Sequence, residues 1–177
     1  MGNALEIIEL GDKRLREPAQ KVNDVFAPEV QELIDNMLAT VKKAHGVGLA
    51  APQVGMMLQI FIVSPSPTQR YPHASIDDTL VVINPKITPK SSEKELDWEG
   101  CLSIPGIRGK VNRYKHISVS YQNRLGEFHT EEFSNFTARI FQHEYDHLNG
   151  TVFLDKLSSL KTLITDNYYF SLMEPKD

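Results

Sequence analysis

The clearest periodic pattern of apolar residues runs from Pro28 to about His45. Its apolar positions recur at the i, i+3, i+4 and i+7 spacing of a helix with one buried face: Val30, Leu33, Ile34, Met37, Leu38 and Val41. Pro28 suits the start of a helix, and Gly46 suits its end. The pattern predicts an amphipathic N-terminal helix that packs on the core.

Shorter apolar runs downstream are typical of strands. Residues 58–63 and 80–83 predict two buried strands, and Asn84-Pro85 predicts a turn or bulge before a short strand at 86–88. Apolar residues alternate with polar ones from 117 to 121 and again around Phe128, on either side of the turn sequence 123–126. That arrangement predicts an antiparallel hairpin.

A second long helix is expected to stop at Gly150, with Ser134 or Asn135 as its cap. Residues 64–78 contain three prolines and several polar residues, so they predict a surface loop inserted between strands. The C-terminal region gives mixed signals. A helix is favoured at 157–163 and a strand at 168–172.

Length and composition restrict the possible classes of protein. A chain of 177 residues with 41% hydrophobic and 24% charged residues can form one full core, which predicts a single domain over residues 1–177. The net charge is -4 and no basic stripe stands out, so we expect no nucleic-acid site. We also expect no signal peptide and no membrane span, and therefore a cytoplasmic protein. The single cysteine, Cys101, excludes an intramolecular disulfide.

One stretch of the second helix carries candidate chemistry, a His-Glu-x-x-His core. His143 and His147 lie about one turn apart, so both imidazoles point from one face and can reach one metal ion. Glu144 lies beside the first histidine, close enough to exchange protons with a water on that ion. Phe136 and Ile140 share this face, so the metal side of the helix is also its core side.

A catalytic metal site needs a third protein ligand and an open coordination position. A metzincin would supply a histidine six residues after His147, but Phe153 stands there. A thermolysin-like glutamate is present only at the extreme C-terminus, and the other histidines carry no spacing signal. Cys101 is the remaining candidate, although a lone cysteine is more often a small core side chain. It follows Gly100 in a polar stretch, which is unusual for core filling.

Three separated segments resemble the signature motifs of the peptide deformylases, in the family's order and at family-like distances. They are Gly-Val-Gly-Leu-Ala-Ala-Pro-Gln at 46–53, Glu-Gly-Cys-Leu-Ser at 99–103 and Gln-His-Glu-Tyr-Asp-His at 142–147. Each is weak or moderate alone, but the three together are highly specific. The resemblance covers about Leu5 to Asp155. It implies an α+β fold in which antiparallel strands wrap around a central metal-binding helix, with the N-terminal amphipathic helix beside them.

The resemblance also implies a chemistry. Cys101, His143 and His147 would hold one divalent ion, usually Fe²⁺ in this family, for which Zn²⁺, Ni²⁺ or Co²⁺ can substitute. A metal-bound water would then attack the formyl carbon at the N-terminus of a newly made polypeptide, with Glu144 as general base and later general acid. The oxyanion donors would be the side chain of Gln53 and the backbone N–H of Leu102. Taken alone, Gln53 would be read as a surface turn residue.

The implied substrate is an N-formylated nascent peptide bound as an extended strand, with transient association of the enzyme with the ribosome. Gly48 suits a close approach of two backbones, with 104–106 on the other side of the peptide. Val47, Phe136 and Ile140 are candidates for the slot that takes the methionine side chain. Ordinary core packing is the alternative for these three.

Charged residues flank the Cys101 segment. The resemblance implies that Glu99, counted among the substrate-site residues, pairs with Arg108 and holds this segment. An unrelated surface pair is the alternative. Asp146 is expected to orient a ligand or to pair with Arg113.

Two other functions compete with this interpretation. A metallopeptidase would need a third ligand of His or Glu, which the sequence does not supply. A deformylase-like fold kept only for binding would have lost Glu144 or a ligand, and all are present. Two departures from the commonest bacterial pattern, the long 64–78 loop and a tail without a long charged helix, concern the subtype and not the chemistry.

Overall fold

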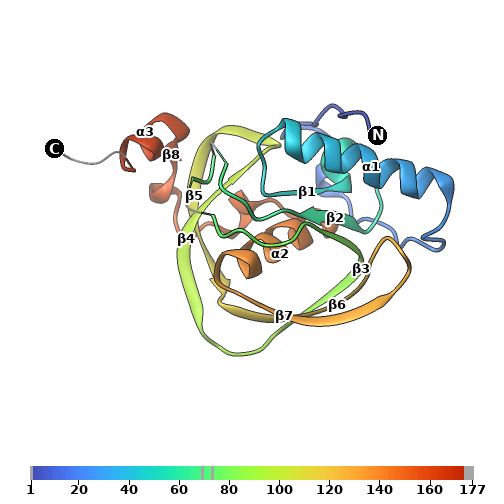
Figure 1. The fold of residues 1–177 in the computed structure, drawn as a ribbon. Coiled ribbons are helices and arrows are strands. Elements are labelled where there is room, and N and C mark those ends of the chain that lie inside the picture. Colours follow the sequence, from blue (N-terminus) through green and yellow to red (C-terminus); the bar gives the residue numbers. More distant parts are fainter. Residues whose placement is uncertain (1, 69, 73, 174–177) are drawn as a thin grey trace.

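The structure is a computed structural model, and it describes residues 2–68, 70–72 and 74–173. Figure 1 shows helix α2 (Asn135–Leu148) near the middle of the molecule, with strands passing around it. One sheet has the order β1-β2-β3-β6-β7 and the other β4-β5-β8, and every pairing between these strands is antiparallel. The remaining elements are α1 (Pro28–Lys43), β1 (Gly48–Ala50), β2 (Ile60–Val63), β3 (Leu80–Pro89), β4 (Lys94–Cys101), β5 (Ile104–Tyr114), β6 (His116–Gln122), β7 (Phe128–Ser134), β8 (Ile164–Thr165) and α3 (Asp166–Ser171), with short 3-10 turns at Lys13–Arg16, Ala51–Val54, Phe153–Lys156 and Leu160–Thr162. The predicted α+β class with antiparallel strands is confirmed.

Strand β2 explains how the larger sheet is covered on both faces. Successive side chains of a strand point to opposite faces. Ile60 and Ile62 belong to the cluster formed with the apolar face of α1, whereas Phe61 and Val63 belong to the cluster formed with α2. Both faces of β2 are therefore buried, which is why its sequence is continuously apolar. The predicted amphipathic helix is confirmed as α1, although it ends at Lys43.

The predicted irregularity after residue 83 is a bulge within one long strand. The pairing of β3 with β6 shifts register between Ile83 and Lys86, and Asn84 has a positive φ of 52°. The Asn84 side chain satisfies the backbone of Val22, accepting from its N–H at 2.9 Å and donating to its carbonyl at 2.8 Å. The predicted hairpin is also confirmed, as β6 and β7.

The apolar patterns did not predict strands β4 and β5. These two strands pair with each other, and Cys101 is the last residue of β4. The first half of β4 is exposed, and β5 buries charged side chains such as Arg108 and Arg113, so neither strand shows a clean alternation of apolar and polar residues.

The C-terminal expectations also need correction. The predicted strand at 168–172 is wrong because the Thr165 side chain accepts from the Tyr168 backbone N–H and starts helix α3. The predicted helix at 157–163 is reduced to the single turn Leu160–Thr162.

The ends of α2 only partly follow the prediction. Ser134 occupies the cap position, but its side chain makes no capping hydrogen bond. The helix ends at Leu148, and Gly150 follows with a φ of 68°. A Cβ at Gly150 would lie 2.6 Å from the backbone carbonyl of Arg16, so glycine is needed for this close approach.

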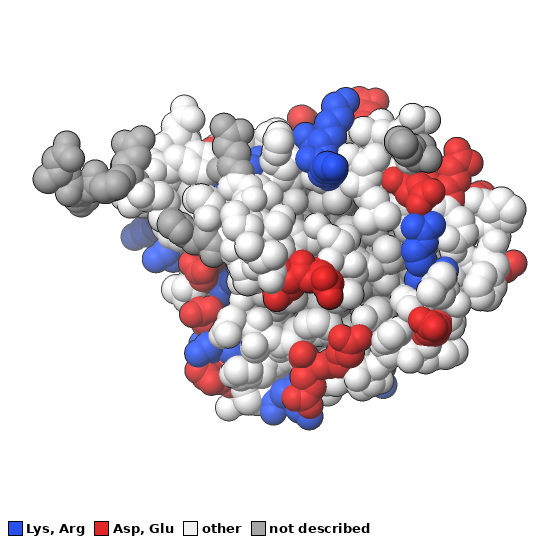
Figure 2. Space-filling view, in the orientation of Figure 1, with Lys and Arg blue, Asp and Glu red and all other residues white. Residues whose placement is uncertain are grey.

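Acidic and basic groups are scattered over the face shown in Figure 2, and uncharged residues cover most of it. Among the described residues, no helix has the length and apolarity needed to cross a bilayer.

Candidate metal centre and peptide pocket

Three potential ligand atoms converge between the two sheets. Cys101 ends β4, whereas His143 and His147 lie one turn apart on α2, and all three side chains are nearly buried. Their ligand atoms lie within 4.8 Å of one another, and Cys101 Sγ lies 3.3 Å from His147 Nε2. Thiolate and imidazole ligands on one tetrahedral ion lie roughly 3.6 Å apart, given the usual metal–sulfur and metal–nitrogen distances. The cluster therefore fits a single divalent ion with little movement.

Glu99 fixes the orientation of His143. The carboxylate lies 2.9 Å from His143 Nδ1, and because a carboxylate only accepts hydrogen bonds, this nitrogen carries the proton. The Nε2 lone pair is then free to bind an ion, as in many carboxylate–histidine–metal arrangements.

Two arginines hold Glu99 in its charged form. Arg113 donates through Nε and Nη2 at 2.8 and 3.0 Å, and Arg139 Nη1 donates at 3.0 Å. Burial alone would raise the pKa of Glu99. The charge of Arg113 and the hydrogen bonds from His143 and Arg113 outweigh burial and hold that pKa well below its usual range.

The expected pairing of Glu99 with Arg108 is wrong. Glu99 and Arg113 point into the same interior space from the paired strands β4 and β5, so Glu99 meets Arg113 and Arg139 there. Arg108 donates instead to Asp166 in α3, at 2.8 Å. The expected contact of Asp146 with Arg113 is confirmed, at 2.6 Å. Asp146 and Glu99 therefore balance the two buried arginines.

Gln53 turns its amide toward the ligand cluster. Its Oε1 accepts from the Ala50 backbone N–H at 2.8 Å, which leaves Nε2 directed at Cys101 Sγ at 3.4 Å and at Ser103 Oγ at 3.2 Å. Gln53 is 1% exposed, so it is not the surface residue that its turn sequence suggests when taken alone. A donor held in this way can stabilise negative charge that develops beside the cluster.

Glu144 is buried beside Gly48 in the edge strand β1. A Cβ at Gly48 would lie 2.4 Å from Glu144 Oε1, so only glycine leaves room for this carboxyl. Burial raises the pKa of Glu144 to about 7. Its Oε2 makes no hydrogen bond within the described part of the chain. A carboxyl group that titrates near neutrality, with a free oxygen, suits proton transfer.

These groups line one pocket that encloses about 470 Å³, part of it open to solvent. Of the residues expected in the site, all but His147 line it: Val47, Gly48, Gln53, Glu99, Cys101, Leu102, Phe136, Ile140, His143 and Glu144. The Nε2 of His147 lies 3.3 Å from Cys101 Sγ, and burial lowers the pKa of His147, which favours the neutral imidazole that can act as a ligand. Residues 104–106 are not part of the lining, which instead includes Gly100, Cys101 and Leu102.

Four further lining residues escaped the sequence analysis: Arg70, Tyr71, Trp98 and Arg139. Arg70 and Tyr71 come from the loop that was predicted to be a surface insertion. No spacing signal could have found them, because they reach the pocket from a part of the chain without regular structure.

Comparisons with known proteins identify the family of this chain. The family described as polypeptide deformylase matches residues 4–163. Peptide deformylase 2 of Nostoc sp. is 46% identical over 169 residues, which cover 96% of this chain and 94% of that protein.

Solved structures are similar as well. The Met-Ala-Ser-bound class I type b peptide deformylase of Acinetobacter baumannii has a TM-score of 0.85 and 40% identity, over 89% of this chain and all (100%) of that one. The Synechococcus elongatus peptide deformylase in complex with actinonin has a TM-score of 0.80 and 36% identity, over 95% of this chain and 85% of that one. The chain belongs to the polypeptide deformylase family.

Proposed function

We propose that Cys101, His143 and His147 form the metal centre with which this deformylase removes the formyl group from the N-terminus of newly made polypeptides. The observation that carries the proposal is the convergence of these three ligand atoms within 4.8 Å, at a pocket that Glu144 and Gln53 also line. A metallopeptidase with a third histidine is not favoured, because the position where that histidine would stand is the buried Phe153, whose ring stacks near His143.

The ligand set suits one divalent ion, which when bound supplies positive charge and a water of lowered pKa for hydrolysis. We take this ion to be Fe²⁺, which a thiolate and two imidazoles accept, as they also accept Zn²⁺, Ni²⁺ or Co²⁺. The charges around the site support binding of a dication. Glu99 and Asp146 neutralise the buried arginines, so the arginines add no net positive charge that would repel the ion.

The chain's own groups carry the proton and stabilise the developing charge. Glu144 accepts the proton of the attacking water and returns it to the leaving amine, so that formate and a free amino terminus are released. The Gln53 Nε2 group, together with the backbone N–H of Leu102, donates to the oxygen that becomes negative. The contact of Gln53 Nε2 with Cys101 Sγ supports this role, because it places the donor on the ligand side of the pocket.

The peptide would bind along β1, which is the terminal strand of its sheet. An edge strand can accept an added strand by backbone hydrogen bonding, and Gly100 to Leu102 face it across the pocket. Val47, Phe136 and Ile140 would surround the methionine side chain, which is apolar and unbranched. We further propose that the enzyme works in the cytoplasm and associates transiently with ribosomes, where formylated chains emerge.

The function is tested by amine release from formyl-Met-Ala-Ser, using protein purified without oxygen. We expect turnover that a chelator abolishes and that added Fe²⁺, Ni²⁺ or Co²⁺ restores. The unformylated peptide Met-Ala-Ser is the matched control, and any new amine from it would indicate a peptidase. An absence of formate release with every one of these ions would refute the proposal.

A methyl group at Gly48 should disable the same site without touching a ligand. In Gly48→Ala the new Cβ displaces Glu144 Oε1, which would lie 2.4 Å away. Because misplacement of a catalytic group by about 1 Å can cost roughly a hundredfold in rate, we expect kcat/KM to fall by about 10²-fold with metal content unchanged.

The Glu144→Gln background is the control for Gly48→Ala. There the methyl group should change the rate little further, since the group that it displaces no longer transfers protons. Equal effects of Gly48→Ala in the two backgrounds would show that Glu144 is not its target.

A further inference from the structure

Arg108 is the largest fully buried side chain among the described residues, and it is not one of the three ligands. It extends from β5 between the C-terminal helix α3 and the loop that carries Arg70 and Tyr71. Its Nε donates to Asp166 at 2.8 Å and its Nη2 donates to the Arg70 backbone carbonyl at 2.9 Å. One guanidinium group therefore ties the C-terminal segment to a loop more than 90 positions earlier in the sequence.

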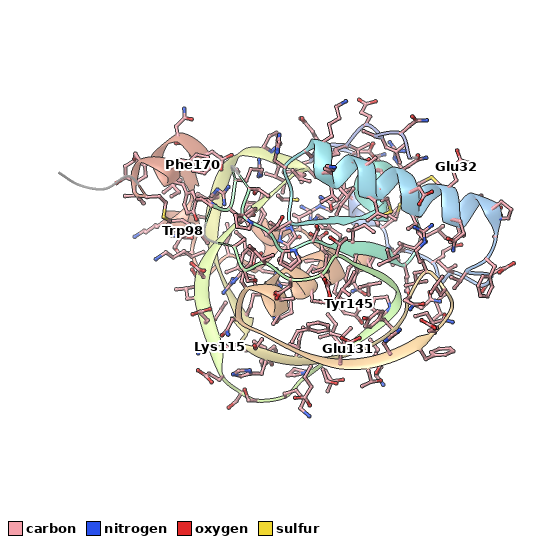
Figure 3. The ribbon with its side chains drawn as sticks, viewed as in Figure 1. Glu32, Trp98, Lys115, Glu131, Tyr145 and Phe170 are labelled. Carbon is pink, nitrogen blue, oxygen red and sulfur yellow. The ribbon has the colours of Figure 1, made fainter. Side chains whose placement is uncertain are left out.

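Aromatic rings enclose the same guanidinium. Its carbon lies 4.2 Å from the ring centre of Tyr169, 4.8 Å from that of Tyr71 and 5.3 Å from that of Phe170. Contacts of a cation with aromatic faces are strongest where water is excluded, as it is here. Tyr169 also meets the ring of Trp98, which lines the pocket, at 5.9 Å. Figure 3 shows Trp98 and Phe170 at the same end of the molecule, where α3 lies against the smaller sheet.

Tyr71 continues these contacts to the catalytic pocket. Its hydroxyl donates to the carbonyl of Gly100, the residue before Cys101, at 3.2 Å. Its ring packs against Phe136 with ring centres 5.6 Å apart, and both side chains line the pocket. The position of Tyr71 therefore sets the width of the pocket beside Phe136.

We infer that Asp166 and Arg108 are positioning residues that hold the Arg70–Tyr71 wall of the peptide pocket, so that the C-terminal segment sets the affinity and side-chain selectivity for the formylated peptide. The inference rests on the proposed function. Neither residue is one of the three ligands, and their effect passes through Arg70, whose Nη1 lies 4.0 Å from Asp166 Oδ2, and through the neighbouring Tyr71. Strand β8 supports this arrangement by pairing Ile164 with Arg108 and Thr165 with Ile107, which fixes where Asp166 begins α3.

The test compares Asp166→Ala with wild type on formyl-Met-Ala-Ser and formyl-Ala-Ala-Ser. We expect KM for the methionine peptide to rise about fivefold to tenfold, in the range of coupling between contacting residues, with kcat within about twofold and metal content unchanged. The preference for methionine over alanine should shrink by a similar factor, because a displaced Tyr71 no longer shapes the pocket beside Phe136. Tyr168→Ala, on the exposed side of the same helix, is the matched control and should leave all these values unchanged.

A double variant separates positioning from general stabilisation. If Asp166 acts through the wall, Asp166→Ala combined with Tyr71→Ala should raise KM no further than the larger single change does. Additive effects, or an unchanged KM and selectivity in Asp166→Ala, would overturn the inference.

Asp166→Asn replaces the alanine variant in this test if that variant does not fold. The asparagine side chain keeps an acceptor for Arg108 Nε and removes the negative charge. Failure of the wild type to release formate would count against the proposed function, whereas an active wild type with an indistinguishable Asp166 variant would count against this inference alone.

Discussion

Replacing Glu144 by Ala should reduce deformylation by about 10²- to 10⁴-fold, the usual contribution of a positioned general acid and base. The protein should keep one equivalent of metal, because Glu144 is not among the three converging ligand atoms. Its stability should not fall, since the change removes a buried carboxyl whose Oε2 has no hydrogen-bond partner in the described part of the chain. Steady-state kinetics, metal analysis and a thermal melt measure these three outcomes.

The control for Glu144→Ala is Glu132→Ala on β7. Glu132 has a side chain that is 68% exposed and paired only with Lys90 among the described residues, so its loss should not alter rate, metal content or melting temperature. A Glu144→Ala enzyme that keeps its metal and more than about a tenth of the wild-type rate would remove Glu144 from the proton transfer.

Replacing Glu99 by Gln should destabilise the fold and weaken metal binding together. The change removes the anion that Arg113 and Arg139 share in the interior, and breaking a buried ion pair typically costs about 3–5 kcal/mol. For a chain of this size that corresponds to a fall in Tm of roughly 10 °C. The His143 ring loses its carboxylate partner as well, so metal affinity should fall by about 10- to 100-fold.

Glu93→Gln is the matched control, since it makes the same chemical change in an exposed pair. The Glu93 side chain is 55% exposed and pairs with Lys115 at 2.8 Å. Pairs of that kind contribute about 0–1 kcal/mol, so Tm should change by no more than a few degrees. Equal melting temperatures for the two variants would mean that the Glu99 cluster does not hold the fold together.

The cluster around Glu99 also shows where sequence reasoning stops. The resemblance to the deformylases, with the opposite charges that flank Cys101, suggested Arg108 as the partner of Glu99. Antiparallel pairing of β4 with β5 instead directs Glu99 and Arg113 into one interior space, and α2 brings Arg139 there. Choosing among several arginines requires knowing which strand faces which, and that depends on long-range pairing.

The sequence by itself determined the local features. Helical periodicity predicted α1, the Asn84-Pro85 pair predicted a turn or bulge where β3 has its bulge, and a spacing of four positions put His143 and His147 on one face of α2. Each of these follows from short-range geometry, which a few neighbouring residues define. The resemblance then related three distant motifs to one family, and the match over residues 4–163 confirms that relation.

Only the tertiary structure decided which distant side chains meet. Gln53 becomes buried and directed at Cys101 because its turn follows β1 directly and packs against α2. Tyr71 reaches the pocket from a loop with no periodic pattern, and Arg108 joins that loop to α3, which the sequence had suggested was a strand. These contacts depend on packing across dozens of residues, where a buried charge takes whichever partner the fold brings to it.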